Sequence, residues 1–184
     1  MWTRLIGELT DTFGFTGHAG IVSGADRVLV ASKYGTYPLQ HAGGVKLHKP
    51  ANDSVVGRVI LARKTDAEVL EQLGYRSIDD TCNGVRGDVL LENIAAVRGL
   101  PVVYVKDFAT PGISSIVTSV SDPGNGEVIG FSLSYPSAAA DAKLSKRMIE
   151  EVESHAREIG RQVRDPAWTK VLEASRPNQV HSVR

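Results

Sequence analysis

Two pairs of β-type segments, each pair joined by a short turn, constrain the fold of this 184-residue chain more than any other feature. The segments are 17–22, 27–32, 113–121 and 127–134, with turns at 23–26 and 122–126. Each pair is typical of a β-hairpin, because β-type residues stop at a cluster of turn-forming residues and resume after it. Residues 101–105 predict a further short strand. The sheet is therefore expected to be mainly antiparallel.

Apolar residues at helical spacing predict helices at both ends of the chain and between the two hairpins. The predicted helices span 2–13, 55–62, 66–73, 88–97 and 139–163. Strands and helices each cluster along the chain, which is typical of the α+β class. We expect a curved, mainly antiparallel sheet with helices on both faces, the two terminal helices on one face and the middle helices partly covering the other. A sheet that is half covered in this way can hold a cavity.

The length of the chain indicates one domain at 1–164, followed by a polar tail at 165–184. Asp165 and Pro166 end the last predicted helix, and the residues after them show no clear period. The first residues lack the apolar run of a signal peptide, and no stretch approaches the ~18 apolar residues of a membrane helix. We therefore expect a cytoplasmic domain without membrane contact.

The charge and cysteine content exclude several kinds of function. Lys plus Arg number 21 and Asp plus Glu number 21, so the chain lacks the basic excess with which proteins neutralise duplex phosphates. It is not expected to bind DNA by itself. Cys82 is the single cysteine, and the histidines lack the spacing of a zinc motif, so we expect neither a disulfide within the chain nor a metal or other cofactor.

Three segments, in the same order, resemble the effector-binding domain of the IclR family of bacterial transcription regulators. Residues 50–62 are similar to the family's Pro-Leu-His-Ala-(small)-x-x-Gly-Lys-x-x-Leu-Ala, residues 112–122 to its Gly-x-x-x-Ile-Ala-x-Pro-Val-x-Asp, and residues 131–136 to its Leu-Ser-Leu-Ser-Gly-Pro. The resemblance covers about residues 3–163. The chain departs from the family at Asn52, where His is usual, and at Val55 and Val56, which are bulkier than the usual residues.

The resemblance implies a GAF-like or profilin-like sensor fold and assembly into a homodimer or homotetramer. It implies a small organic acid or a related metabolite as the effector. It also implies that DNA is bound only through a winged helix-turn-helix domain, which would precede this domain and is absent from the sequence given. The expected function is therefore that of an effector-binding and oligomerisation domain that controls DNA binding, and not that of an enzyme.

The predicted start of the helix at residues 54–57 is the first part of the candidate site. The first backbone N–H groups of a helix lack partners within it and favour negative charge. Ser54 is the first residue of this turn. The side chains of Val55 and Val56 would form an apolar wall beside the backbone donors, and Gly57 would allow a ligand to approach closely. The alternative is an ordinary capped helix, whose donors are satisfied by Asn52 or Asp53.

The predicted strand at 127–134 supplies the second part of the site. Ser132 and Ser134 lie two residues apart, so both hydroxyls face one side of the sheet and can bind a carboxylate or a carbonyl. Ser115 lies on the neighbouring strand and could join them. Asp107 lies near the acidic pair of the IclR family and could orient a hydroxyl or amine of the ligand. The alternatives are a solvated strand face for the serines and a surface acid for Asp107.

Two other classes of function stay open from the sequence. One is a small Ser- or Cys-dependent hydrolase or isomerase on a GAF-like fold, which a hydrogen bond between His18 and Ser132 or Ser134 would favour. The other is an oligomerisation module without a ligand, which a sheet face filled by its own side chains would favour.

Overall fold

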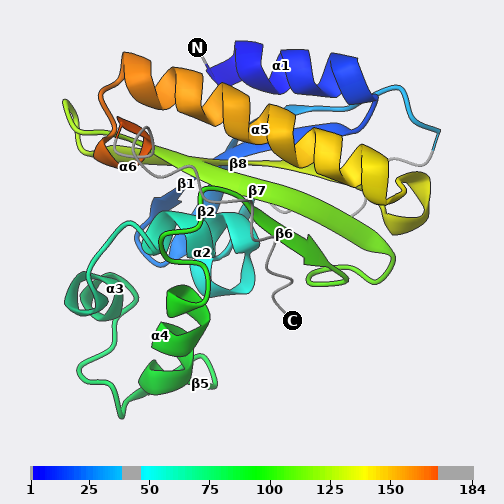
Figure 1. Ribbon diagram of the computed structural model, residues 1–184. Coiled ribbons are helices and arrows are strands. Elements are labelled where there is room, and N and C mark those ends of the chain that lie inside the picture. Colours follow the sequence, from blue (N-terminus) through cyan, green and yellow to red (C-terminus); the bar gives the residue numbers. More distant parts are fainter. Residues whose placement is uncertain (1, 39–46, 170–184) are drawn as a thin grey trace.

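The computed structural model describes residues 2–38 and 47–169, which contain one six-stranded antiparallel sheet in the order β3-β2-β1-β8-β7-β6 (Figure 1). Its strands are β1 (Thr16–Ser23), β2 (Asp26–Lys33), β3 (His48–Pro50), β6 (Val103–Lys106), β7 (Ile113–Asp122) and β8 (Glu127–Pro136). The two predicted hairpins are confirmed as β1–β2 and β7–β8, and they join through β1 and β8 at the centre of the sheet. The strand predicted at 101–105 begins two residues later, and β3 was not predicted.

The helices lie on both faces of this sheet, as expected from the sequence (Figure 1). They are α1 (Trp2–Phe13), α2 (Val55–Leu61), α3 (Asp66–Gln72), α4 (Gly87–Ala95), α5 (Ala142–Gln162) and α6 (Pro166–Thr169). Helices α1 and α5 cover one face, whereas α2 packs on the other with α3 and α4 beyond it. Short 3-10 turns precede α2 and α5, and a ribbon of β4 (Thr81–Cys82) and β5 (Val85–Arg86) precedes α4. The α+β class and the curved antiparallel sheet are thus confirmed.

The alternation of side chains along β8 separates two environments. Phe131, Leu133 and Tyr135 are each 1% exposed and pack in the core beneath α1 and α5. Ser132 and Ser134 lie between them in sequence and therefore face the opposite side, toward α2. This face therefore carries serine hydroxyls next to the apolar Val117, which is the direct partner of Ser132 on β7.

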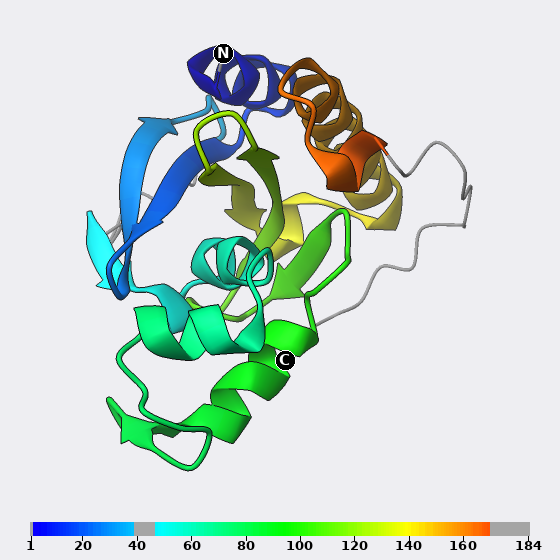
Figure 2. The same cartoon turned by 90° about the vertical axis from the view of Figure 1, so that its left-hand side faces the viewer.

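Helix α2 approaches the sheet closely because β8 has a glycine beneath it. A Cβ atom added at Gly130 would lie 2.8 Å from Val56 Cγ1 and 3.1 Å from Ile60 Cδ1. A side chain at this position would therefore push α2 away from the sheet. On its other side, α2 contributes Leu61 to a second small core, where Val69 of α3 and Leu90 of α4 are also buried. Figure 2 shows the sheet curving around α2.

A buried ion pair ties the C-terminal end of α2 to the sheet and to α6. Arg63 lies 3.2 Å from Asp165, whose carboxylate is 1% exposed and also accepts a hydrogen bond from the Ser121 amide at 2.8 Å. Arg63 and the Trp168 indole both donate to the Ser119 carbonyl, at 2.6 and 3.0 Å. The first residues of the predicted polar tail therefore pack on the domain, while residues 170–184 lie outside the described part of the chain.

Among the helices of residues 2–38 and 47–169, none combines the length and the apolar character that a membrane crossing requires.

Replacing Asp165 with alanine is expected to destabilise the domain by about 3–5 kcal/mol, because it leaves a largely buried guanidinium without its partner and frees a buried amide. Urea unfolding followed by circular dichroism measures the change. Asp11→Ala is the matched control, since Asp11 pairs with Lys33 at 2.6 Å but its side chain is 70% exposed. Such a surface pair is worth about 0–1 kcal/mol. Equal losses in the two variants would contradict the role assigned to Asp165.

Candidate functional site

A cavity of about 250 Å³ lies between the sheet and the start of α2. Its floor is the face of the sheet opposite α1 and α5, and its walls are the first residues of α2 and the connection between β6 and β7. The lining residues come from six strands, one helix and one loop: His18, Ala19, Gly20, Arg27, Leu29, Lys49, Ser54, Val55, Val56, Val105, Phe108, Ala109, Thr110, Ile113, Ser115, Val117, Ser132 and Ser134. The half-covered sheet thus leaves a hollow where α2 does not reach.

The structure brings six of the eight predicted site residues to this one cavity. Those that line it are Ser54, Val55, Val56, Ser115, Ser132 and Ser134. Residues separated by up to eighty positions in sequence meet here because α2 packs across the central strands β1, β8 and β7. The helix start and the serine strand therefore face a common space, as the sequence interpretation requires.

The serine hydroxyls form a polar floor. Ser115 and Ser134 are directly opposite each other on β7 and β8, and their Oγ atoms are 2.9 Å apart. Ser132 and Ser134 are each 7% exposed. A hydroxyl both donates and accepts, so the pair can turn toward a carbonyl, a hydroxyl or a carboxylate of a ligand.

Gly57 does not line the cavity, and its role differs from the one expected. A Cβ atom there would lie 2.1 Å from the Ala51 carbonyl oxygen, so the missing side chain allows α2 to pack against the preceding turn, not against a ligand. The Gly57 amide donates to Ser54 Oγ at 3.4 Å, which makes Ser54 the cap of the helix. Asn52 and Asp53, which were expected to satisfy the helix donors in the alternative interpretation, do not take this position.

Asp107 also lies outside the cavity lining. Its side chain is exposed, its φ of 58° places it in the left-handed region, and its carboxylate accepts a hydrogen bond from the Gly112 amide at 2.5 Å. It therefore shapes the connection between β6 and β7. Of the two alternatives for Asp107, a surface acid fits this position better than a residue that contacts a ligand.

Two cations of the lining were missed by the sequence reading. Arg27 on β2 is 8% exposed, and Lys49 on β3 is half-buried. Alternation along the predicted strand at 27–32 places Arg27 on the same face as Leu29, which was an available signal. For Lys49 the sequence gave no such signal, because strand β3 was not predicted. No acidic residue is among the described residues that line the cavity.

Burial changes the proton affinity of two arginines at the site. Desolvation lowers the pKa of Arg27 from its ordinary value. Desolvation also lowers the pKa of Arg58, with the nearby Asp53 acting in the opposite direction. Arg58 contacts Phe108, a residue of the cavity lining: its guanidinium lies 4.7 Å from the centre of the Phe108 ring. The same guanidinium donates a hydrogen bond to the Asn52 carbonyl at 2.7 Å.

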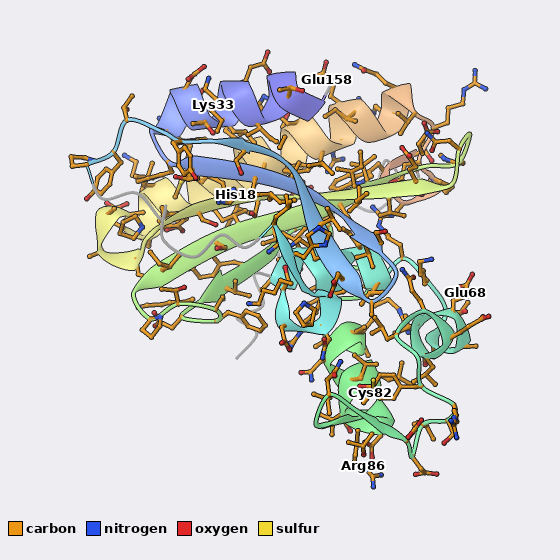
Figure 3. All side chains as sticks on the ribbon, turned by 180° about the vertical axis from the view of Figure 1, so that it is seen from behind. His18, Lys33, Glu68, Cys82, Arg86 and Glu158 are labelled. Atoms are coloured by element: carbon orange, nitrogen blue, oxygen red, sulfur yellow. The ribbon has the colours of Figure 1, made fainter. Side chains whose placement is uncertain are left out.

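His18 and Ser132 are direct partners in the register of β1 and β8 and both line the cavity, but the hydrogen bond described for the His18 ring is with Ser32. The Nδ1 atom of His18 is 2.8 Å from Ser32 Oγ, and Ser32 is exposed and outside the cavity lining. Cys82 lies on β4, far from His18 (Figure 3). Within the part of the chain that the structure describes, no cluster of three or more His, Cys, Asp or Glu side chains is placed to hold a metal ion.

No protein-family model matches the chain, and no curated protein matches its sequence significantly. Its structure is nevertheless similar to solved structures of transcriptional regulators. One from a Rhodococcus species is 22% identical, with a TM-score of 0.70, covering 89% of this chain and 66% of that one. The IclR of Thermotoga maritima is 18% identical, with a TM-score of 0.68, covering 87% and 66%. The C-terminal domain of the E. coli regulator KdgR is 20% identical, with a TM-score of 0.67, covering 87% and 94%.

The chain therefore spans less than two thirds of the Rhodococcus and Thermotoga proteins but nearly all of the E. coli domain. Its fold is that of the C-terminal domain of IclR-family regulators.

Gly57→Ala is expected to destabilise the domain by about 1–3 kcal/mol, because the added methyl group collides with backbone. Gly7→Ala on α1 is the matched control, since the nearest atom to its added Cβ, Lys33 Nζ, is 3.8 Å away. That change is expected to stabilise the helix by roughly 0.5–1 kcal/mol. Thermal unfolding without ligand measures both. An unchanged melting temperature for Gly57→Ala would contradict the packing role.

Proposed function

We propose that this chain is the effector-binding domain of an IclR-type transcription regulator and that its cavity binds a small organic acid. The observation that carries the proposal is the common cavity of α2 and the Ser132–Ser134 strand. In this proposal a regulator of this kind acts in the cytoplasm as a homodimer or homotetramer and binds DNA through a separate winged helix-turn-helix domain.

The chemistry of the lining supports an acid with a short carbon body. Val55, Val56, Val105 and Val117 form an apolar side, while the serine floor and Arg27 provide donors for oxygen atoms. Ligand sites typically combine a mostly apolar wall with a few polar groups that fix orientation. The volume of about 250 Å³ favours a metabolite of a few carbon atoms.

Regulation requires that the ligand distinguish two arrangements of the subunits. A ligand with equal affinity for both arrangements does not change the equilibrium between them, however tightly it binds. A coupling of about 1–3 kcal/mol between the cavity and the subunit contacts is typical of such systems. Helix α2 is suited to this coupling because one end lines the cavity and the other end is bonded to β7 and α6 through Arg63.

The alternatives have less support. A hydrolase would need a serine hydroxyl that is hydrogen-bonded to a base; His18 lies beside Ser132 in the sheet, but its Nδ1 atom engages Ser32, which is outside the cavity lining. A module for oligomerisation alone would have its own side chains filling the sheet face, whereas this face is hollow.

Thermal unfolding with a panel of small carboxylic acids tests the proposal. An acid at a hundred times its Kd is expected to stabilise the domain by about 2.7 kcal/mol, which raises the melting temperature by roughly 5–10 °C. Neutral amides of the same acids are the controls for the charge. The absence of a shift with every acid would contradict the proposal.

Ser134→Ala is expected to weaken binding of an acid found in this way by about 1 kcal/mol, or roughly fivefold in Kd, because one hydrogen bond to the ligand is lost. Ser145→Ala is the matched control: it also removes one serine hydroxyl, but Ser145 lies on α5, beyond the core. Isothermal titration calorimetry compares the two. Equal affinities for both variants and the unchanged protein would exclude the serine floor from the site.

A further inference from the structure

A second cavity, of about 290 Å³, lies at the opposite end of α2 from the candidate site. Its lining comes from α2 and the turn after it, the connection between α4 and β6, strand β7 and helix α6: Val59, Ala62, Arg63, Val97, Gly99, Leu100, Pro101, Thr118, Ser119, Ala167 and Trp168. This hollow is called the Trp168 cavity below. The two linings share no residue, so the two cavities are separate.

The indole of Trp168 forms a fixed wall of this cavity. Trp168 is 2% exposed, and its Nε1 atom donates a hydrogen bond to the Ser119 carbonyl at 3.0 Å. A Cβ atom added at Gly160 would lie 2.5 Å from Trp168 Cβ, so the tryptophan packs directly on the backbone of α5. Val59 and Val97 form buried parts of the opposite walls. Walls that are held in place relax only partly around an empty space, so the hollow is a feature of the fold.

The charge of Arg63 is neutralised within the protein. Its Nε atom donates to Ser119 Oγ at 3.0 Å, and its Nη2 atom donates to the Ser119 carbonyl at 2.6 Å. The guanidinium also lies 3.2 Å from the buried carboxylate of Asp165. An anionic ligand in the Trp168 cavity would therefore compete with a carboxylate that the fold already holds in place.

The hydroxyl groups of the lining are engaged as well. Thr118 donates a hydrogen bond to the Pro101 carbonyl at 2.6 Å, and Ser119 donates to the Val59 carbonyl at 3.2 Å. Each polar side chain that is described in this lining thus has a partner within the protein. A charged or strongly polar ligand would lose its hydration without gaining new partners. The Trp168 cavity therefore favours a ligand that needs no hydrogen bonds.

The size of the cavity suits a single small ring. Apolar cavities of roughly 150 Å³ stay free of water and hold benzene. The Trp168 cavity is larger, at about 290 Å³, and leaves room for a ring with a small substituent. Three of its lining residues, Gly99, Pro101 and Ala167, are exposed, which places the opening of the cavity beside them.

We infer that the Trp168 cavity is a second ligand site and that its ligand is a small, neutral and apolar molecule such as a monocyclic aromatic compound. The site goes beyond the proposed function, because the acid at the other end of α2 contacts none of its residues. A failure of one site would therefore leave the other standing.

Titration of toluene into the whole chain tests the second site. The chain has two tryptophans, Trp2 and Trp168, so the replacement Trp2→Phe identifies the indole N–H signal of Trp168 in a nitrogen–proton correlation spectrum. We expect toluene to shift this signal in a saturable manner, with a Kd of about 1 mM or tighter. Benzoate is similar in size but carries a negative charge, and it is expected to bind at this signal at least about tenfold more weakly.

Ala62→Leu and Ala167→Leu are expected to weaken toluene binding about tenfold or more, because each places a larger side chain in the lining. Ala67→Leu is the matched control, since Ala67 is exposed on α3 and outside the lining, and it is expected to leave the Kd unchanged. Circular dichroism establishes that each variant is folded. Ala167 is exposed, so its variant disturbs the core least.

Toluene binding that survives both Ala62→Leu and Ala167→Leu would overturn the second site. Binding of benzoate as tight as that of toluene, read at the Trp168 signal, would overturn the apolar ligand class. The absence of any shift with toluene would also overturn the inference, and would mean that the cavity is closed or filled by another part of the chain. None of these results would contradict the proposed acid site, whose test depends on residues of the other lining.

Discussion

The close approach of α2 to the centre of the sheet determines both the shape of the domain and the position of its cavity. Gly130 beneath the helix and Gly57 against the preceding turn leave no room for side chains, so α2 fits tightly between the strands and residue 51. Because the helix has only seven residues, it covers only part of the sheet face. The uncovered part becomes a hollow, and its floor is made of whatever β7 and β8 place on that side.

Those two strands place serines there because of simple alternation. Phe131, Leu133 and Tyr135 complete a dense core with the long helix α5, and the residues between them must face the other way. The same strand thus stabilises the fold with one face and offers hydroxyls with the other. Loss of a core residue would disturb the cavity indirectly, whereas loss of a serine would leave the core intact.

Much of this arrangement could be predicted from the sequence because it depends on local periodicity. Hairpins, helices and the shared face of Ser132 and Ser134 follow from spacing alone. The role of Gly57 could not be predicted, since a glycine that admits a ligand and a glycine that admits a neighbouring carbonyl look the same in a sequence. For Asp107 the surface position was one of the two alternatives that the sequence left open. Arg27 and Lys49 were missed because their placement depends on a bulge and on a three-residue edge strand, and neither has a periodic signature.

The ion pair of Arg63 and Asp165 gives α2 a fixed point. Since this end is bonded to β7 and α6, an occupant that pushes on the opposite end can move the helix mainly by tilting it about that anchor. Leu61, the residue of α2 that packs with Val69 and Leu90, lies two residues before Arg63, so the helix meets α3 and α4 at its anchored end. A tilt about Arg63 would therefore displace the end of α2 beside the cavity most and leave its contact with α3 and α4 almost unchanged.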